Sequence, residues 1–256
     1  MVSQYEDVKR QVAVANRILA DVGLAVGIRS ALGHASLRVP SNPDEFVVKG
    51  RQYAVDSLAT MRPEDMVVCN TEGFLVEGSP GLTQCSEIKI HSCIYKTRPE
   101  IQSVVHVHPR YTVLASVLGL TLRPMCQEGI ELVRRPLPVY PHVKTIQSDA
   151  EGMELADQLG AGATILLQGH GAVTTGESLS ESVTAMIQLE EQAWMNYLAF
   201  CAMGRDYPQV PDHLIEEMTD RVPLHELPHF QEVLQGRPPQ RDGIWNYRVE
   251  RVSQGL

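Results

Sequence analysis

The stretch Val104-Val105-His106-Val107-His108 ends an apolar run with two histidines one residue apart. Alternate side chains of an extended strand lie on the same face, so the stretch predicts a buried strand that presents two imidazoles to one ion. A third histidine, His170, follows the apolar run Ile165-Leu166-Leu167 and lies between two glycines, which let the backbone turn closely around an ion. An isolated histidine is more often a packed or surface residue, but together the three predict a three-histidine metal site.

Three neutral imidazoles favour one divalent transition metal per subunit, Mn²⁺, Fe²⁺, Co²⁺ or Zn²⁺, over Ca²⁺ or Mg²⁺, which prefer oxygen ligands. An ion with an open position would be catalytic, because it stabilises negative charge that develops on a bound oxygen. Glu87 is the candidate acid/base, in the first turn of a predicted helix before the histidine strand. The alternative is a carboxylate that only complements the helix N-terminus. His91, one turn further, is expected to be buried and hydrogen-bonded instead of a ligand.

The composition narrows the class of protein. The 256-residue chain has a net charge of −9 and no basic cluster, which argues against a nucleic-acid partner. Its five cysteines are scattered and include no C-x-x-C pair, as expected for reduced thiols. The N-terminus has no apolar leader, and no apolar stretch of about 20 residues follows. We therefore expect a cytoplasmic protein that does not interact with membranes.

Hydrophobic periodicity predicts a set of β-hairpins followed by alternating helices and strands. The expected strands cover residues 35–39, 45–49, 66–69, 74–76, 104–108 and 163–167, and the expected helices cover 3–22, 86–98, 111–118, 149–159 and 178–203. This order predicts an α/β sandwich in which helices cover a largely antiparallel sheet. Residues 1–205 form the expected catalytic domain. Residues 206–256 are richer in proline and arginine and are expected to pack on the core or on a neighbouring subunit.

Five separated motifs have the order and spacing of one known family. They are Gly33-His34-Ala35-Ser36-Leu37-Arg38, Arg62-Pro63-Glu64-Asp65-Met66-Val67-Val68 leading to Gly73 and Glu77-Gly78, Ser86-Glu87, His106-Val107-His108-Pro109, and Gly169-His170-Gly171. Over about residues 5–205 the chain thus resembles the class II aldolase/adducin family. The resemblance implies an α/β/α fold assembled as a homotetramer, with active sites near subunit interfaces. It also implies a divalent metal on His106, His108 and His170, and Glu87 as the catalytic acid/base.

The chain departs from the sugar-phosphate aldolases of that family at the positions that bind the substrate phosphate. Those enzymes carry an asparagine, hydroxyl residues and a pair of serines, whereas this chain has His34, Glu72, and Cys85 with Ser86. A glutamate repels phosphate, and the substitutions remove hydrogen-bond donors. We therefore do not expect a phosphorylated sugar as substrate.

The Gly-His form of the first motif resembles the branch that decarboxylates hydroxylated aromatic or heteroaromatic dicarboxylates, such as dihydroxyphthalate. An ortho-hydroxy carboxylate can chelate a metal that holds the charge left as carbon dioxide departs. We expect a small anionic aromatic substrate, bound by His34, Arg38, Ser86 and Glu72. Arg38 has the planar fork suited to a carboxylate, although a structural ion pair would use it equally well.

A further departure is His142, where the aldolases often carry a tyrosine that donates a proton in the neighbouring subunit's site. His142 can do the same or bind a carboxylate, the alternative being a surface loop residue. Three other functions stay open. They are retro-aldol cleavage of an unphosphorylated hydroxy-keto acid, non-haem iron oxygenation, and an adducin-like scaffold without chemistry.

Overall fold

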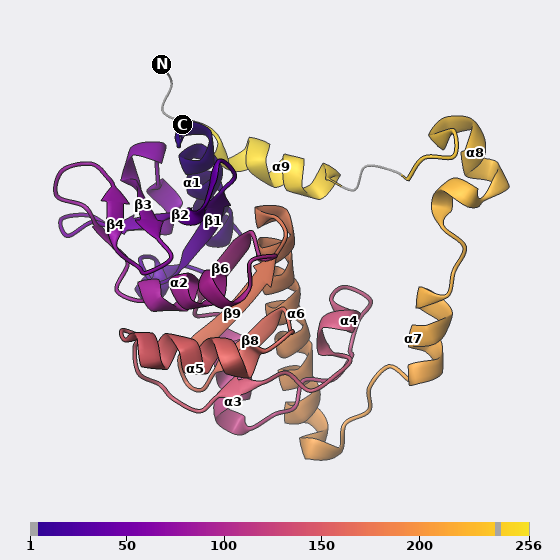
Figure 1. Ribbon diagram of the computed structural model, residues 1–256. Coiled ribbons are helices and arrows are strands. Elements are labelled where there is room, and N and C mark those ends of the chain that lie inside the picture. The colour runs from indigo at the N-terminus through magenta and orange to yellow at the C-terminus, as the bar shows by residue number, and fades with distance from the viewer. Residues whose placement is uncertain (1–4, 239–241, 256) are drawn as a thin grey trace.

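The computed structural model describes residues 5–238 and 242–255 and is built around one mixed sheet (Figure 1). The strands follow the order β4-β3-β2-β1-β6-β9-β8-β7, with β5 paired to β2. All neighbours are antiparallel except β7 and β8. The strands are β1 (His34–Val39), β2 (Asn42–Arg51), β3 (Met66–Asn70), β4 (Leu75–Glu77), β5 (Thr83–Gln84), β6 (Ser103–Val107), β7 (Val139–Tyr140), β8 (Thr164–Leu167) and β9 (Gly171–Gly176). The predicted, largely antiparallel sheet is confirmed.

Helices cover both faces of this sheet, which gives the predicted α/β/α sandwich. The helices are α1 (Glu6–Asp21), α2 (Ile88–Thr97), α3 (Arg110–Leu118), α4 (Ile130–Val133), α5 (Asp149–Leu159), α6 (Leu179–Met203), α7 (Asp212–Thr219), α8 (Pro228–Leu234) and α9 (Gly243–Val252). Helices α1, α3 and α6 pack on the face that presents Val105 and Val107. Helices α2 and α5 pack on the opposite face, which presents Val104 and Val173. The two cores follow from the alternation of side chains along each strand.

Strand β9 is the central strand that the sequence pattern did not predict. It contains two glycines, two threonines and an alanine, so it lacks the alternating apolar pattern that identified the others. It pairs with β6 on one side and with β8 on the other. Because β8 and β9 form a tight hairpin, the turn between them lies beside the end of β6. The topology therefore brings His170 to the His106–His108 pair.

The C-terminal segment leaves the body of the protein after α7 and returns at α9. Figure 1 shows α8 standing away from the sandwich, whereas α9 lies beside α1. Helix α7 keeps contact with the body, because its Ile215 is fully buried and its Glu216 pairs with Arg134 at 3.6 Å. Arg17 of α1 donates to the carbonyls of Val252 and Gln254 at 3.0 Å each, and Arg251 pairs with Asp21. Even α6, the longest described helix, is not apolar enough to cross a membrane, and no other described helix qualifies.

Candidate metal and active site

The two histidines of the first motif lie at the end of β6. His106 is the fourth residue of the strand and is fully buried, whereas His108 follows the strand's last residue and is partly exposed. Their Nε2 atoms are 3.1 Å apart. The Nδ1 atom of His106 lies 3.0 Å from the carbonyl oxygen of Ala172. A carbonyl can only accept, so Nδ1 donates its hydrogen to Ala172 and Nε2 is the nitrogen that faces the cluster.

His170 approaches this pair from the β8–β9 turn. Its backbone is held by Leu167, whose carbonyl accepts from the His170 N–H at 3.1 Å, and the N–H of Gly169 donates to Ser116 Oγ at 3.0 Å. Gly171 is required here, because an added Cβ would overlap the carbonyl oxygen of Val107. Gly171 therefore allows the turn to lie against β6.

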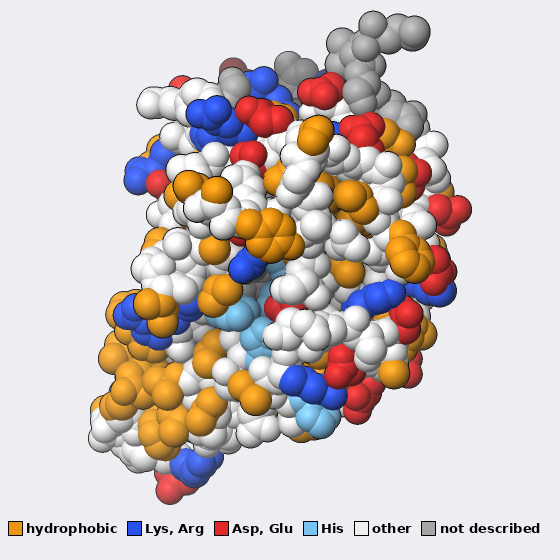
Figure 2. Space-filling view, turned by 90° about the vertical axis from the view of Figure 1, so that its left-hand side faces the viewer, with side chains coloured by type: hydrophobic (Ala, Val, Ile, Leu, Met, Phe, Trp, Pro, Cys, Tyr) orange, Lys and Arg blue, Asp and Glu red, His pale blue; other side chains and the backbone are white. Residues whose placement is uncertain are grey.

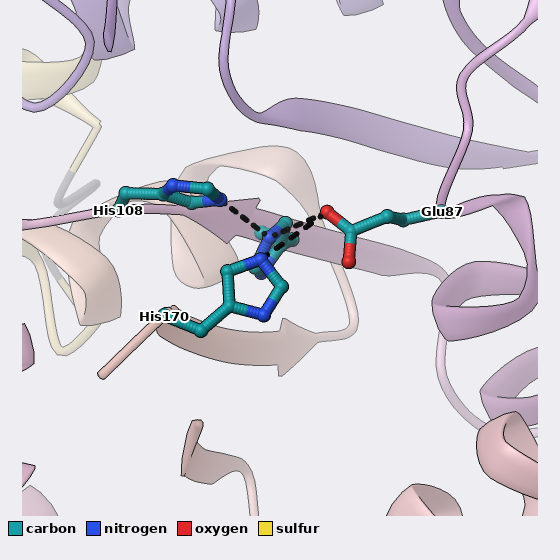
Figure 3. Close-up of side chains that lie close together, drawn as sticks. Glu87, His108 and His170 are labelled. Carbon is teal, nitrogen blue, oxygen red and sulfur yellow. Dashed lines mark hydrogen bonds and ion pairs between the residues drawn. The ribbon is translucent and has the colours of Figure 1, made fainter. Parts of the chain in front are cut away.

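Glu87 completes the cluster from the N-cap position of α2 (Figure 3). Its Oε2 atom lies 3.2 Å from His106 Nε2 and 3.5 Å from His170 Nε2, and its Oε1 accepts from the backbone N–H of Ile146 at 3.1 Å. The side chain makes no capping hydrogen bond and is directed to the imidazoles instead. Burial by itself raises the pKa of this carboxyl, but His106 and His170 outweigh burial and hold the pKa far below its ordinary value. Glu87 is therefore ionised.

The four donor atoms fit a divalent transition metal. Ligand atoms about 2.0–2.1 Å from a tetrahedral ion are separated by about 3.3 Å. Three of the spacings here, 3.1, 3.2 and 3.5 Å, are close to this value, and all four donor atoms lie within 4.8 Å of one another. Burial, with smaller effects from His106 and His170, lowers the pKa of His108 to about 3, so this imidazole is neutral. The Glu87 carboxylate is stable beside these rings only with positive charge between them, either a second hydrogen on an imidazole or a metal ion. The backbone hydrogen bond from His106 Nδ1 is the usual support for a metal-binding imidazole.

The cluster is open to solvent on one side. Figure 2 shows histidine side chains at the bottom of a hollow whose rim carries hydrophobic side chains. Arg29 lies in the short helix Gly27–Arg29 before β1, and its positive charge makes a small contribution to the lowered pKa of His108. Sequence reasoning missed Arg29, because it lies outside the motifs and a single loop arginine carries no pattern.

Two further predicted substrate residues lie beside the cluster. The backbone of His34, at the start of β1, pairs with that of His106, and their ring centroids are 5.3 Å apart. Gly33 allows this approach, since its φ is +110° and an added Cβ would lie 2.6 Å from Val107 Cγ1. Ser86 is exposed and directly precedes Glu87. It does not cap α2, which begins two residues later than the pattern suggested, because Glu87 holds the N-cap position.

Three other predicted residues are not brought to the cluster. The guanidinium of Arg38 is buried and donates to the backbone carbonyls of Pro43, Tyr95, Arg98 and Ile101, so it has a structural role without the anticipated ion pair.

Glu72 is the second of these residues, and its carboxylate pairs with Lys96 near the far end of α2, 2.6 Å away. The third, His142, stacks edge-on against Tyr140 in the loop after β7, with ring centroids 4.8 Å apart. Within one copy of the described chain, neither side chain takes part in the cluster.

Comparison with known proteins agrees with this geometry. The family model of the class II aldolase and adducin N-terminal domain matches residues 10–197. The chain belongs to this family. Among solved structures, a class II aldolase superfamily protein from Pseudomonas syringae superposes with a TM-score of 0.79 at 21% identity, covering 99% of this chain and 95% of that one.

Curated relatives within the class II aldolase and adducin family include two decarboxylases. The 3,4-dihydroxyphthalate decarboxylase of Rhodococcus jostii is 31% identical over 232 residues, which cover 84% of this chain and 93% of the relative. The enzyme of the same name from a Terrabacter species is 29% identical over 227 residues, covering 86% and 92%. The chain is accordingly a carbon–carbon lyase of the carboxy-lyase class, as the sequence predicted.

Proposed function

We propose that this class II aldolase-family protein is a metal-dependent decarboxylase of a hydroxylated aromatic or heteroaromatic dicarboxylate resembling dihydroxyphthalate. The observation that carries the proposal is an ionised Glu87 whose Oε2 lies at ligand spacing from two of three converging imidazoles. The similarity to relatives named 3,4-dihydroxyphthalate decarboxylase supports the substrate class.

The metal centre would consist of one divalent ion, Mn²⁺, Fe²⁺, Co²⁺ or Zn²⁺, per subunit. His106, His108 and His170 would hold this ion, which supplies stabilisation of negative charge on an oxygen of the substrate. The neutral state of His108 leaves that side chain ready to bind a cation without losing a proton, and the hydrogen bond from His106 Nδ1 to Ala172 directs Nε2 of His106 to the ion.

Glu87 would move the proton. Being ionised, it first acts as a base and accepts the proton of the substrate's phenolic hydroxyl group. The bond between the ring and the carboxylate then breaks, carbon dioxide leaves, and the bonding pair remains in the ring. Glu87 returns its proton to the ring carbon, and the product leaves as a phenolate that regains a proton from water. Atoms and charge balance, so no oxidant or reductant is needed.

Substrate binding would use groups on the rim of the cluster. His34 and Ser86 lie beside the imidazoles and Glu87, and Arg29 supplies a positive charge for the carboxylate that is retained. Arg29→Gln should raise KM about tenfold for a dianionic substrate, because a hydrogen bond to a charged group is lost, and should leave the metal content unchanged. An unchanged KM would remove Arg29 from the binding site.

The assembly would be a homotetramer with active sites near subunit interfaces. Helices α7 and α8 and the short helix Leu224–Glu226 between them carry exposed apolar side chains, including Leu214, Leu224 and Val233, which a neighbouring subunit would cover. In such an assembly His142 would reach a neighbouring site, where it would donate a proton or bind a carboxylate. Sedimentation equilibrium tests the assembly, and complementation between His142→Ala and Glu87→Gln subunits in mixed tetramers tests the shared site.

The function is tested by incubating metal-reconstituted enzyme with 3,4-dihydroxyphthalate under nitrogen. The expected result is release of one equivalent of carbon dioxide and a product that is lighter than the substrate by the mass of one carbon dioxide molecule. Cleavage of a hydroxy-keto acid without carbon dioxide release would favour a retro-aldolase. Activity only with iron and oxygen would favour an oxygenase, and failure to bind any metal would favour a scaffold.

A further inference from the structure

A buried chain of four hydrogen-bonding side chains extends from the metal cluster into the core. Tyr95 Oη lies 2.7 Å from Ser36 Oγ, Ser36 Oγ lies 2.6 Å from His91 Nδ1, and His91 Nε2 lies 2.6 Å from His34 Nδ1. Ser36 and His91 are fully buried, and the two end residues are at most 5% exposed. Strand β1 supplies two members and helix α2 supplies the other two.

The hydrogens along this chain have a preferred direction. The Tyr95 hydroxyl group has one hydrogen and two acceptors within reach, Ser36 Oγ at 2.7 Å and the carbonyl of Gln102 at 3.3 Å, and the shorter contact is the stronger hydrogen bond. Tyr95 therefore donates to Ser36. The hydrogen of Ser36 is then directed to His91 Nδ1, because its alternative acceptor, the carbonyl of Val104, is 3.4 Å away.

The same direction continues through the two imidazoles. His91 Nε2 and His34 Nδ1 are 2.6 Å apart, so one of these nitrogens donates a hydrogen and the other accepts it. Burial is the main cause that lowers the pKa of His91 to about 3, so the His91 ring is neutral. A neutral imidazole has one hydrogen, on either Nδ1 or Nε2. Since His91 Nδ1 accepts from Ser36, its hydrogen is on Nε2 and is donated to His34 Nδ1. The hydrogen of His34 is consequently on Nε2.

We propose that the Tyr95–Ser36–His91 chain fixes the tautomer of His34, so that His34 Nε2–H serves as a hydrogen-bond donor to an oxygen of the anionic substrate. The inference rests on the proposed function, in which the substrate carries carboxylates. Carboxylate oxygens only accept hydrogen bonds, so the opposite tautomer would present a lone pair and repel them. His91 is thus a positioning residue that acts through His34.

The tautomer can be observed directly in the intact protein. Histidine labelled with ¹⁵N in the ring distinguishes a nitrogen that bears hydrogen from one that does not, and the His34 signals are those missing in His34→Gln. We expect Nε2 of His34 to bear the hydrogen and Nδ1 to be bare at pH 7. A hydrogen on Nδ1 would overturn the proposal, whether or not decarboxylase activity is found.

A matched pair of serine variants tests the effect on substrate. Ser36→Ala removes the donor to His91, and Ser92→Ala removes a buried hydroxyl group from the next position of α2, outside the chain. With 3,4-dihydroxyphthalate, Ser36→Ala should raise KM about tenfold and leave kcat within about twofold, with unchanged metal content.

Ser92→Ala should keep the wild-type KM. Equal KM values for both variants, with an unchanged His34 spectrum in Ser36→Ala, would overturn the proposal. Absence of all activity in the wild type would instead count against the proposed function, while the spectrum still decides the tautomer.

Discussion

Replacing Glu87 with glutamine separates proton transfer from metal binding. The amide has the shape of the carboxylate, and its oxygen can still accept from the N–H of Ile146, so this hydrogen bond, worth about 0.5–1.5 kcal/mol, is retained. The three imidazoles are unchanged, and one metal ion per subunit should remain. What the amide cannot do is accept and return a proton at the position of Oε2.

The expected loss follows from that difference. General acid–base catalysis contributes about 10²–10⁴-fold. At about 1.36 kcal/mol per tenfold, this is about 2.7–5.4 kcal/mol of barrier height. We therefore expect Glu87→Gln to lower kcat at least 100-fold, measured by carbon dioxide release, with metal content determined on the same sample by emission spectroscopy.

Glu154→Gln is the matched control. Its carboxylate accepts from the Tyr140 hydroxyl group at 3.0 Å on helix α5, outside the cluster, and an amide oxygen can also accept that hydrogen bond. The control should keep the wild-type rate. A Glu87→Gln enzyme that retained its metal and turned over within about threefold of wild type would refute the role of Glu87 as acid/base. Loss of both metal and activity would indicate that Glu87 mainly binds the metal.

The remaining predictions concern the imidazoles and the tight turn before β1. His108→Ala should lower metal content below about a tenth of wild type and abolish turnover, as measured by metal analysis and carbon dioxide release. Because burial lowers the pKa of His91 to about 3, the unfolded chain binds a proton between about pH 6.5 and 3 that the folded chain does not. The stability of the metal-free protein should therefore fall as the pH falls through this window, by up to about 1.4 kcal/mol per pH unit for this residue, and urea unfolding of His91→Gln should show a shallower slope. Gly33→Ala should destabilise the protein by about 1–3 kcal/mol, and more than Gly23→Ala does. Both glycines have a positive φ, but of these two only Gly33 has a neighbour, Val107, that an added Cβ would meet. Thermal unfolding of both variants checks this prediction.

Much of the site could be predicted from the sequence because its donors lie at the ends of regular elements. The period of a strand fixes the relation between His106 and His108, and a glycine-flanked turn fixes His170, so each local pattern predicts a direction in space. Glu87 was identified through its motif, and the structure adds the reason: the N-cap of α2 points at the end of β6.

Other contacts could not be predicted, because residue type alone does not reveal which partners a side chain meets. Arg38 has the correct chemistry for a carboxylate, yet four backbone carbonyls surround its guanidinium. Glu72 lies in the expected turn, but its carboxylate turns to Lys96. Strand β9 was missed since its glycines and threonines have no hydrophobic period, although it is the strand that joins the two histidine elements. Such long-range contacts are absent from any local pattern.

One hydrogen bond links the candidate catalytic carboxylate to a surface loop. Oε1 of Glu87 accepts from the N–H of Ile146, which belongs to the loop after β7 that also carries His142. A protonated carboxyl group is a weaker acceptor than a carboxylate, so each uptake of a proton by Glu87 loosens the loop's attachment, and each release tightens it. The attachment of the loop would therefore depend on whether Glu87 is protonated. The hydrogen-exchange rate of the Ile146 N–H would rise with the fraction of time that Glu87 is protonated during turnover.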